Sequence, residues 1–576
     1  MSTKRTGAKA LALLAGSSLA LTACATSDPG TSPSASGSAS ATTAPITFTW
    51  GYEQEFASYN NNTSEQNASA NAVVLNQVLR GFWYFAPDGK IVRDTEFGTF
   101  EKTSDAPLTV KYKFNEKAAW SDGEPIDCDD AVLFWLGNSG KAPADANGKN
   151  GFSSAGTTGY ENQQKPQCKD KDKEFTVVYD TPFADWESMY GGFQPAHILE
   201  KQAGVTDIIA AADDPKGADS LKAAAFWNKG WELKPGTLKP ELTPSAGPYT
   251  ISAWSAGQSL TLEANPKWWG TPALSKNIVI RIMGGDTMTQ ALQNGEINAM
   301  DPQPQRDLVE QLKKLGDKVK VSNEDQYTYE HFTFNFKSPV MKDLATRQAF
   351  AKCIPRQQII DNLIKPVNPN AKIQQSRAIF PFQPEYADFE NSIGGEKYNE
   401  VDIEGAKALL KGATPTVRIG WRKDPQALNK RRVDEVALVT ASCAKAGFKV
   451  EDTGAPDFFE NAWPKGNFDV GMFAWSSSPL VTASTSTYTT GGGNNNGKYS
   501  NPAVDADLKA LGQETDKAKQ IELVKKIETQ LWTDLHSVPV FAFPGILATS
   551  PNAEGVEFNA TQAGLTWNAS KWSLKQ

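Results

Sequence analysis

The chain has 576 residues, of which 39% are hydrophobic and 22% charged, and its formal net charge is −8. A single core stops growing near roughly 250 to 300 residues, so this length predicts two or three lobes. The chain has no cluster of basic residues of the kind that binds nucleic acid. Beyond the first two dozen residues, no apolar run is long enough to span a bilayer.

The N-terminus has the pattern of an export signal, residues 1–23, in which a positively charged start precedes an apolar segment at 10–21. The stretch "LTAC" that ends at Cys24 resembles the bacterial lipobox, in which the signal is cut before the cysteine and the sulfur receives a diacylglycerol. The resemblance predicts lipidation of Cys24. Residues 24–45, rich in Ser, Ala, Thr and Pro, have little to bury and are predicted to form a flexible tether.

Strands and helices are predicted to interleave through the rest of the chain. Alternation of β-branched and aromatic residues predicts strands at 46–52, 110–114, 175–179, 249–254, 260–264 and 278–283. Helical periodicity occurs at 71–83, 287–295, 306–316, 345–354, 403–412, 433–447 and 519–535. This order indicates a mixed α/β protein with parallel or mixed sheets. The polar stretch 141–163 and the glycine-rich stretch 491–497 are predicted to be surface or binding loops.

Five cysteines in an exported chain leave one unpaired, and assigning Cys24 to the lipid leaves four. Four cysteines allow three connectivities. We favour Cys128 with Cys168, which are close in sequence, and Cys353 with Cys443, which lie on two predicted helices. Four free buried thiols are the alternative, less typical of a protein outside the cytoplasm.

Several segments, in order, look like signature stretches of the family 5 extracellular solute-binding proteins, the peptide, dipeptide and nickel receptors of ABC importers. They include "VKYKFNEKAAWSDGEPIDCDDAVLFW" at 110–135, "GPYTISAWSAGQSLTLEANPKWWG" at 247–270, "ALQNGEINA" at 291–299 and "FTFNFKSPVMKDLATRQAFAKCIPRQQII" at 332–360. The similarity runs from about residue 46 to the end of the chain. The same residues also suit structural roles, for example Asp127 and Asp129 as helix N-caps.

The resemblance implies a periplasmic-binding-protein-like α/β fold of the class II or cluster C type, with two large lobes plus an extra domain, mixed sheets and a hinged ligand cleft. Lobe I would comprise 45–75, 240–325 and 545–576, lobe II 76–239, and lobe III 326–544. Closure about a hinge would trap the ligand away from water.

Two stretches are expected to face the ligand. In the family's peptide binders a loop after the first strand faces the cleft, and "GYEQEFASYNNNT" at 51–63 occupies that place. Its candidate ligand residues are Glu55, Phe56, Tyr59, Asn60 and Asn61, which suit a peptide edge and polar ligand atoms. The alternative to a ligand-binding role is a structural one, in which the stretch forms an Asn-rich turn that caps a helix.

The second stretch, "FDVGMFAWSSSP" at 468–479, resembles the family's buried strand that carries a Trp into the cleft, and Trp475 matches that Trp. Peptide receptors have an Asp three residues later that pairs with the peptide's ammonium group, whereas this chain has Ser478. Either another acid, such as Glu53 or Glu55, replaces it, or the ligand has no free amino terminus there. The other candidates are Ser476, Ser477, Trp463 and Tyr488.

No catalytic residues and no metal or cofactor are predicted. The SxxK pattern at 442–445 lacks the KTG and SDN motifs of penicillin-binding enzymes, and no HExxH, P-loop or GxSxG occurs. His197, His331 and His536 are scattered along the chain, which does not predict a zinc site.

The sequence thus predicts a monomeric, exported receptor, lipid-anchored to the outer face of the cytoplasmic membrane and not an enzyme. It would bind oligopeptides or similar extended solutes and pass them to ABC permease and ATPase subunits. The alternatives are a non-peptide ligand (an oligosaccharide, or a nickel or haem complex) and a sensor or adhesion protein that binds without delivery.

Overall fold

The computed structural model describes residues 45–142, 151–425 and 428–575, which belong to one structural unit. The predicted signal, Cys24 and the tether up to residue 44 lie outside the described residues.

A ten-stranded mixed sheet is the largest element of the fold, with the order β13-β12-β14-β11-β15-β10-β1-β9-β8-β7. In chain order its strands are β1 (Thr47–Tyr52), β7 (Tyr249–Ser255), β8 (Ser259–Ala264), β9 (Asn277–Ile282), β10 (Ala299–Met300), β11 (Lys320–Phe334), β12 (Thr416–Gly420), β13 (Lys449–Asp452), β14 (Val470–Ser476) and β15 (Ser537–Thr549). β1 runs parallel to β9 and β10, and β12 parallel to β13 and β14, whereas the other neighbours are antiparallel. The mixed α/β class predicted from the sequence is therefore confirmed.

Three small antiparallel sheets lie outside it. They are β2 (Trp83–Phe85) with β3 (Ile91–Arg93), β4 (Gly98–Asp105) with β5 (Leu108–Phe114) and β6 (Glu174–Val178), and β16 (Ala553–Glu554) with β17 (Ser573–Leu574).

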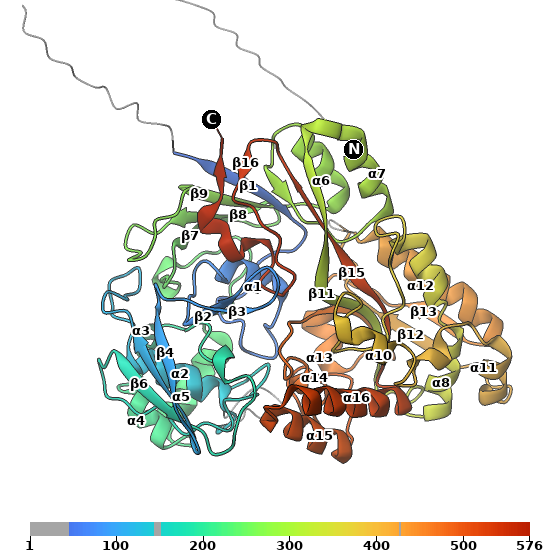
Figure 1. The fold of residues 1–576 in the computed structure, drawn as a ribbon, viewed down its shortest axis with the longest axis horizontal. Coiled ribbons are helices and arrows are strands. Elements are labelled where there is room, and N and C mark those ends of the chain that lie inside the picture. The colour runs from blue at the N-terminus through green and yellow to red at the C-terminus, as the bar shows by residue number, and fades with distance from the viewer. Residues whose placement is uncertain (1–44, 143–150, 426–427, 576) are drawn as a thin grey trace, which may run out of the picture. The chain divides into compact units, whose positions relative to one another are not determined.

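Helices connect the strands throughout (Figure 1). Before β11 they are α1 (Ser69–Leu75), α2 (Cys128–Asn138), α3 (Ala196–Ala203), α4 (Ile208–Asp213), α5 (Ala218–Lys229), α6 (Gly285–Gln293) and α7 (Arg306–Leu315). After it come α8 (Leu344–Cys353), α9 (Arg356–Ile359), α10 (Ala387–Glu390), α11 (Ile403–Leu410), α12 (Lys430–Ala446), α13 (Trp463–Lys465), α14 (Thr485–Tyr488), α15 (Pro502–Gln513) and α16 (Lys517–Thr533). Within the described residues, no helix is both long and apolar enough to cross a membrane.

One predicted element is shorter in the structure. The helix expected at 71–83 ends at Leu75, and the chain enters β2 at Trp83. The carbonyls of Gln77 and Val78 instead accept hydrogen bonds from the N–H groups of Tyr249 (3.1 Å) and Ala246 (2.8 Å). Tertiary hydrogen bonds thus replace those a longer helix would make.

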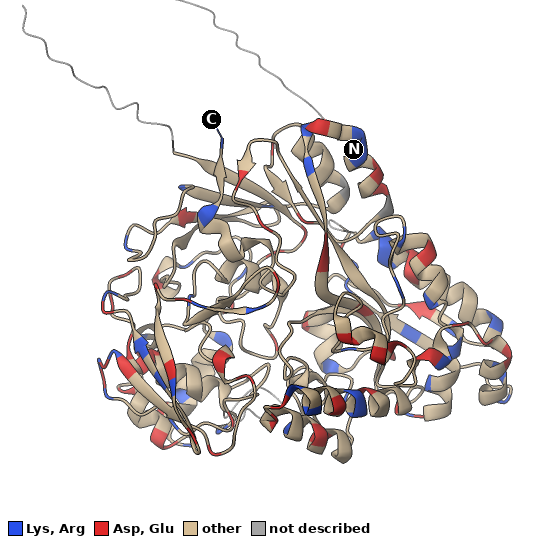
Figure 2. Cartoon of the chain, in the orientation of Figure 1, with Lys and Arg blue, Asp and Glu red and all other residues tan. Residues whose placement is uncertain are grey.

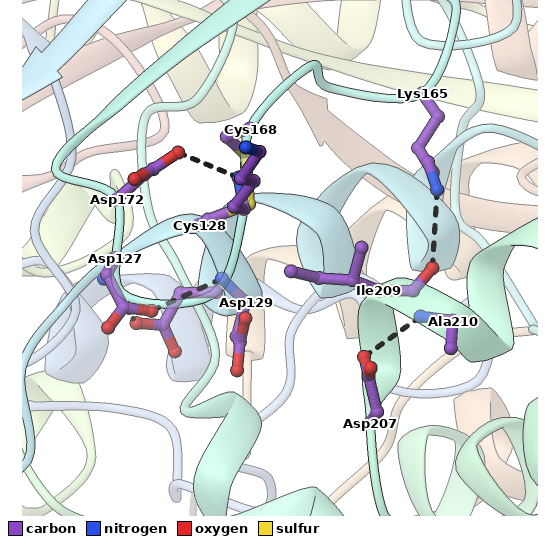
Figure 3. The surroundings of a disulfide bond; sticks show 11 residues. Asp127, Cys128, Asp129, Lys165, Cys168, Asp172, Asp207, Ile209 and Ala210 are labelled. Atoms are coloured by element: carbon purple, nitrogen blue, oxygen red, sulfur yellow. Dashed lines mark hydrogen bonds between the residues drawn. A yellow bond between two sulfur atoms is a disulfide. The ribbon is translucent and has the colours of Figure 1, made fainter.

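The two disulfides join the cysteines that the sequence paired, Cys128 with Cys168 and Cys353 with Cys443. The first lies at the start of α2, where the Asp127 side chain accepts a hydrogen bond from the Asp129 N–H as helix N-cap (Figure 3). It ties α2 to the loop that leads into β6.

Buried apolar residues form two large clusters. One draws on residues 48–299 and on 547–572, and the other on 332–543. A smaller cluster packs α6 and α7 against the sheet, between Met288 and Val319. The predicted boundaries of the three lobes remain predictions.

Candidate functional site

Strands β11 and β15 run side by side through the ten-stranded sheet, and their pairing is interrupted (Figure 1). Residues 320–325 pair with 544–549, and pairing resumes at Tyr329 with Ala542. Within the gap, the Tyr327 N–H donates to the Ala560 carbonyl (2.7 Å) and the Tyr327 carbonyl accepts from the Ser477 N–H (2.6 Å). A break of this kind in a strand pair is a place where a sheet can bend, so it is a candidate hinge.

One cavity is lined by α1, α2 and the loop before α3, and a second cavity reaches α14 and α15. Cavity A, of about 390 Å³, is lined only by residues between 61 and 194. Cavity B, of about 680 Å³, is lined by residues between 64 and 183 and, on its other wall, by residues between 482 and 513. Gly156 lines both cavities, which are therefore neighbours.

Cavity A is aromatic and amide-lined. Its aromatic side chains are Trp83, Phe134, Tyr160 and Phe193, and its amides are Asn61, Asn62, Asn67, Asn76, Asn138 and Gln194. No Asp, Glu, Lys or Arg lines it within the described part of the chain. Such a surface suits uncharged ligand groups that make hydrogen bonds and aromatic contacts.

Cavity B is rich in hydroxyl groups. Among the described residues, five threonines and four serines line it, together with the acids Glu65, Glu161 and Asp505 and one basic residue, Lys509, so the described lining carries more acidic than basic groups. The Glu65 carboxylate accepts a hydrogen bond from the Ser153 hydroxyl (2.7 Å). Burial raises the pKa of Glu161 above its usual value, against the opposing hydrogen bonds of its own backbone N–H, Gly159 and Thr157.

The two walls of cavity B approach closely at two glycines, Gly493 and Gly156. A Cβ placed on Gly493 would lie 2.4 Å from the Ser154 carbonyl oxygen, so only glycine fits there. A Cβ on Gly156 would lie 3.2 Å from the Ser486 Cβ. Gly493 belongs to the stretch 491–497 that the sequence predicted to be a surface or binding loop, and it lies in the wall of cavity B together with Gly491 and Gly492.

Of the residues predicted in the loop 51–63, Asn61 lines cavity A. Asn60 is buried behind it, and its side-chain oxygen accepts from the Asn62 backbone N–H (3.1 Å) and side-chain amide (3.0 Å). Asn60 therefore orients Asn62, a lining residue. Tyr59 is buried with its hydroxyl on the Pro244 carbonyl.

The other two residues of that loop also contact protein groups. Phe56 is buried and packs edge-on against Trp254, with ring centroids 5.5 Å apart. The Glu55 carboxylate accepts from the Trp254 Nε1–H (3.1 Å) and the Gly257 N–H (2.9 Å), which holds the turn between β7 and β8. Their assignment to a ligand remains a prediction.

None of the residues predicted around β14 lines cavity A or cavity B, although Tyr488 lies on α14, whose Thr485 and Ser486 line cavity B. Trp475 is half-buried and stacks over His331, and the Ser476 hydroxyl accepts from Thr328 (3.2 Å). Ser477 donates its N–H to Tyr327, and the Ser478 hydroxyl accepts from the Leu480 N–H (3.4 Å). Trp463 is buried against Phe468, and Tyr488 is buried with its hydroxyl 3.0 Å from that of Tyr329.

Sequence reasoning missed Trp83 and the loop Gly191–Gln194, which line cavity A. Trp83 was placed at the end of a helix, and the loop carries no motif beyond a Gly-Gly pair before an aromatic residue. That pair was the one available signal, because paired glycines let a backbone approach closely to neighbouring groups.

No group of His, Cys, Asp and Glu in the described part of the chain is arranged to hold a metal ion. Burial lowers the pKa of His331 and of His536 well below the usual value, so both imidazoles are neutral. In the SxxK pattern, Ser442 is buried on α12 next to the disulfide-bonded Cys443.

Comparison with known proteins matches residues 96–498 to the model of the bacterial extracellular solute-binding proteins, family 5, middle region. An uncharacterized lipoprotein of Mycobacterium tuberculosis is 28% identical over 537 residues, covering 90% of this chain and 91% of its own length. The oligopeptide-binding protein OppA of the same species is 25% identical over 500 residues, or 84% of this chain and 77% of OppA.

Two solved structures share the fold. A periplasmic EDTA-binding protein, EppA, superposes with a TM-score of 0.75 at 22% identity, covering 92% of this chain and 96% of its own. The oligopeptide-binding protein AppA of Bacillus subtilis, in complex with a nonapeptide, has a TM-score of 0.74 at 17% identity, covering 92% of this chain and all of AppA.

The chain belongs to the family 5 extracellular solute-binding proteins. It is therefore a binding protein with the periplasmic-binding-protein fold and not an enzyme.

Proposed function

We propose that the protein is the lipid-anchored receptor of an ABC importer and captures oligopeptides or similar extended solutes. The observation that carries the proposal is that cavity B lies between two distant parts of the chain, residues 64–183 and 482–513, and has cavity A as its neighbour at Gly156. An oligopeptide is long enough to occupy both cavities, and the similarity to OppA supports this ligand class.

The interrupted pairing of β11 and β15 supplies the hinge for capture. Bending there would move the wall 482–513 toward or away from the wall 64–183, so cavity B opens and closes while cavity A keeps its lining. The permease and ATPase subunits would receive the ligand from this monomeric receptor.

The anchor is the Cys24 sulfur at the outer face of the cytoplasmic membrane. The "LTAC" sequence supports it, and so does the description of the Mycobacterium tuberculosis relative as a lipoprotein. Mass spectrometry of the exported chain tests this step: a diacylglycerol on Cys24 is expected, and an unmodified thiol at the mature N-terminus rejects it.

The acids that the sequence suggested as replacements for the missing Asp are engaged inside the protein. Glu53 accepts from the Gln303 N–H (3.2 Å), and Glu55 holds the β7–β8 turn. We place a cationic group of the ligand in cavity B, near Glu65 and Glu161, where the excess of acids favours it.

Thermal unfolding of the full chain with tri- to hexapeptides, N-acetylated peptides and oligosaccharides tests the ligand class. A peptide at a hundredfold excess over its Kd should stabilise the folded state by about 2.7 kcal/mol. In Gly493→Ala the new methyl group meets the Ser154 carbonyl and this stabilisation should shrink. Gly512→Ala, which also lies in the wall of cavity B, is the matched control for the clash, because its Cβ meets only a Thr482 methyl at 3.7 Å.

A non-peptide ligand is the second candidate. The uncharged lining of cavity A suits a neutral oligosaccharide as well as a peptide. Stabilisation by an oligosaccharide and by none of the peptides selects this candidate, and genes for permeases and ATPases beside this one favour delivery over sensing.

A further inference from the structure

Three hydrogen bonds cross from one wall of cavity B to the other. The Asp185 carboxylate accepts from the Thr482 N–H (3.0 Å) and from the Thr482 hydroxyl (2.7 Å). Next to it, the Ala184 N–H donates to the Gly512 carbonyl (2.7 Å). Thr482 and Gly512 line cavity B, and so does Phe183, which precedes Ala184. The three bonds therefore join the two walls at the border of the cavity.

Each partner of the Asp185–Thr482 contact belongs to a hydrogen-bonded turn of its own wall. The Asp185 carbonyl accepts from the Ser188 N–H (2.9 Å) and from the Ser188 hydroxyl (2.7 Å). On the other wall, the Thr482 carbonyl accepts from the Thr485 N–H (3.0 Å) at the start of α14. Separation of the walls about the β11–β15 hinge therefore pulls two fixed turns apart and breaks the bonds between them.

The contact between the walls excludes water from the Asp185 carboxylate. Thr482 is 6% exposed. Burial raises the pKa of the Asp185 carboxyl, and the hydrogen bonds from Thr482 and the charge of Lys517 oppose this rise. Closure thus removes water from the carboxylate, and Thr482 replaces that water with two donors. All of these donors and acceptors are protein groups, so the bonds can hold the walls together without a ligand.

We propose that Asp185 and Thr482 form a latch that holds cavity B closed in the ligand-free receptor, so that a ligand enters only after the latch has opened. The inference rests on the proposed function, of which it names the regulation. A latch that stabilises the empty and the occupied closed states equally slows binding and release together. It therefore sets how fast a ligand exchanges and leaves the affinity nearly unchanged.

Hydrogen exchange of the full chain without ligand tests the latch. Asp185→Ala removes the carboxylate and keeps both partners of the Ala184–Gly512 bond, so exchange of the Ala184 N–H reports separation of the walls. This N–H should exchange about tenfold faster in the variant. The matched control is Asp180→Ala, which removes a nearby carboxylate that accepts from Gln164 of the same wall (3.0 Å) and should leave the rate unchanged.

Thr482→Val is a second variant, placed on the opposite wall. It keeps the size of the side chain and the backbone N–H but removes the hydroxyl donor. The Ala184 N–H should exchange about threefold faster in it. The control is Thr533→Val, whose lost hydroxyl donates to the Thr529 carbonyl of its own helix (2.8 Å). Exchange of the Ala184 N–H at the wild-type rate in the folded latch variants overturns the proposal.

Binding kinetics provide a second readout. The probe is the tri- to hexapeptide that gives the largest thermal stabilisation, followed by stopped-flow tryptophan fluorescence. In Asp185→Ala the association and dissociation rates should both rise about tenfold, while the Kd changes less than about threefold. A rise in the dissociation rate alone contradicts a latch in the empty receptor. If no peptide binds, the peptide function is rejected, and exchange of the Ala184 N–H still decides the latch.

Discussion

The two regions that face each other across cavity B have different interiors. Before residue 200 the core is aromatic: the Phe82 ring lies between 5.1 and 6.4 Å from the rings of Phe97, Phe100, Tyr112, Phe114, Phe175 and Phe193. Beyond residue 320 the interior contains ion pairs, such as Arg377 with Glu528 at 2.7 Å, whose side chains are 0% and 2% exposed.

The cavities reflect this difference. The described residues that line cavity A all belong to the aromatic region, and none of them is charged. One wall of cavity B, in contrast, is formed by residues of the second region. Figure 2 marks charged residues in blue and red along α12 and α16 of the second region. Buried ion pairs gain little net stability but are costly to break. Removal of one partner of such a pair should therefore destabilise the second region.

The largest effect is expected from Glu330 on β11. Its fully buried carboxylate pairs with Arg431 and Arg432, both at 3.1 Å. Glu330→Gln removes the negative charge that these two buried guanidinium groups share. It should therefore lower the free energy of unfolding by about 3–5 kcal/mol. Urea unfolding measures the loss, and Glu324→Gln on the same strand is the control. A loss no larger than the control's contradicts the contrast between the regions.

A covalent link across cavity B should have the next largest effect. Cysteines at Gly156 and Ser486 would have Cβ atoms close to the separation of a disulfide, and oxidation would hold the walls together. Ligand association should slow about a hundredfold and recover on mild reduction. Stopped-flow fluorescence measures the rate, and Ser486→Cys alone is the control. An unchanged rate would mean that ligand reaches its site without separation of the walls.

The smallest effect concerns Asp469, just before β14, which accepts from Ser338 (2.6 Å) and from the Arg418 guanidinium (3.0 Å). Burial alone would raise the pKa of Asp469, but these hydrogen bonds lower it below its usual value. Because the folded-state pKa is depressed, the stabilisation is present above the ordinary Asp pKa and is lost as pH falls through the folded value.

Asp469→Asn should therefore cost about 2 kcal/mol at neutral pH. The difference from the wild type should narrow in acid, below about pH 4. Asp343→Asn is the control, because Asn keeps the N-cap of α8. Unfolding curves between neutral pH and acid give the free energy of unfolding of both variants and of the wild type. If the difference between wild type and Asp469→Asn stays constant across that range, the pKa of Asp469 is not lowered in the folded protein.

Most of the fold could be predicted from the sequence, because periodicity is strong where an element buries one face. The helices at 306–316 and 519–535 formed as α7 and α16, within two residues at each end. The helix predicted at 71–83 was wrong beyond Leu75, because carbonyls of this segment accept hydrogen bonds from residues about 170 positions away. No local sequence pattern carries that information.

The candidate site was less accessible to sequence reasoning. Of the five residues named in the loop 51–63, Asn61 lines cavity A, and Tyr59 and Asn60 are buried next to it; their contact with a ligand stays a prediction. Trp83 and Gln194 could not be found, since they line cavity A together only after distant segments of the chain have folded against each other.

The position of β15 in the sheet has a consequence for biosynthesis. This strand, residues 537–549, is the neighbour shared by β10 and β11, so the sheet remains in two pieces until nearly all of the polypeptide has been translated. An emerging chain cannot finish its central sheet early, because the closing strand arrives last. Late completion of the sheet would keep the newly made protein in an unfolded state, which passage through a secretion channel requires.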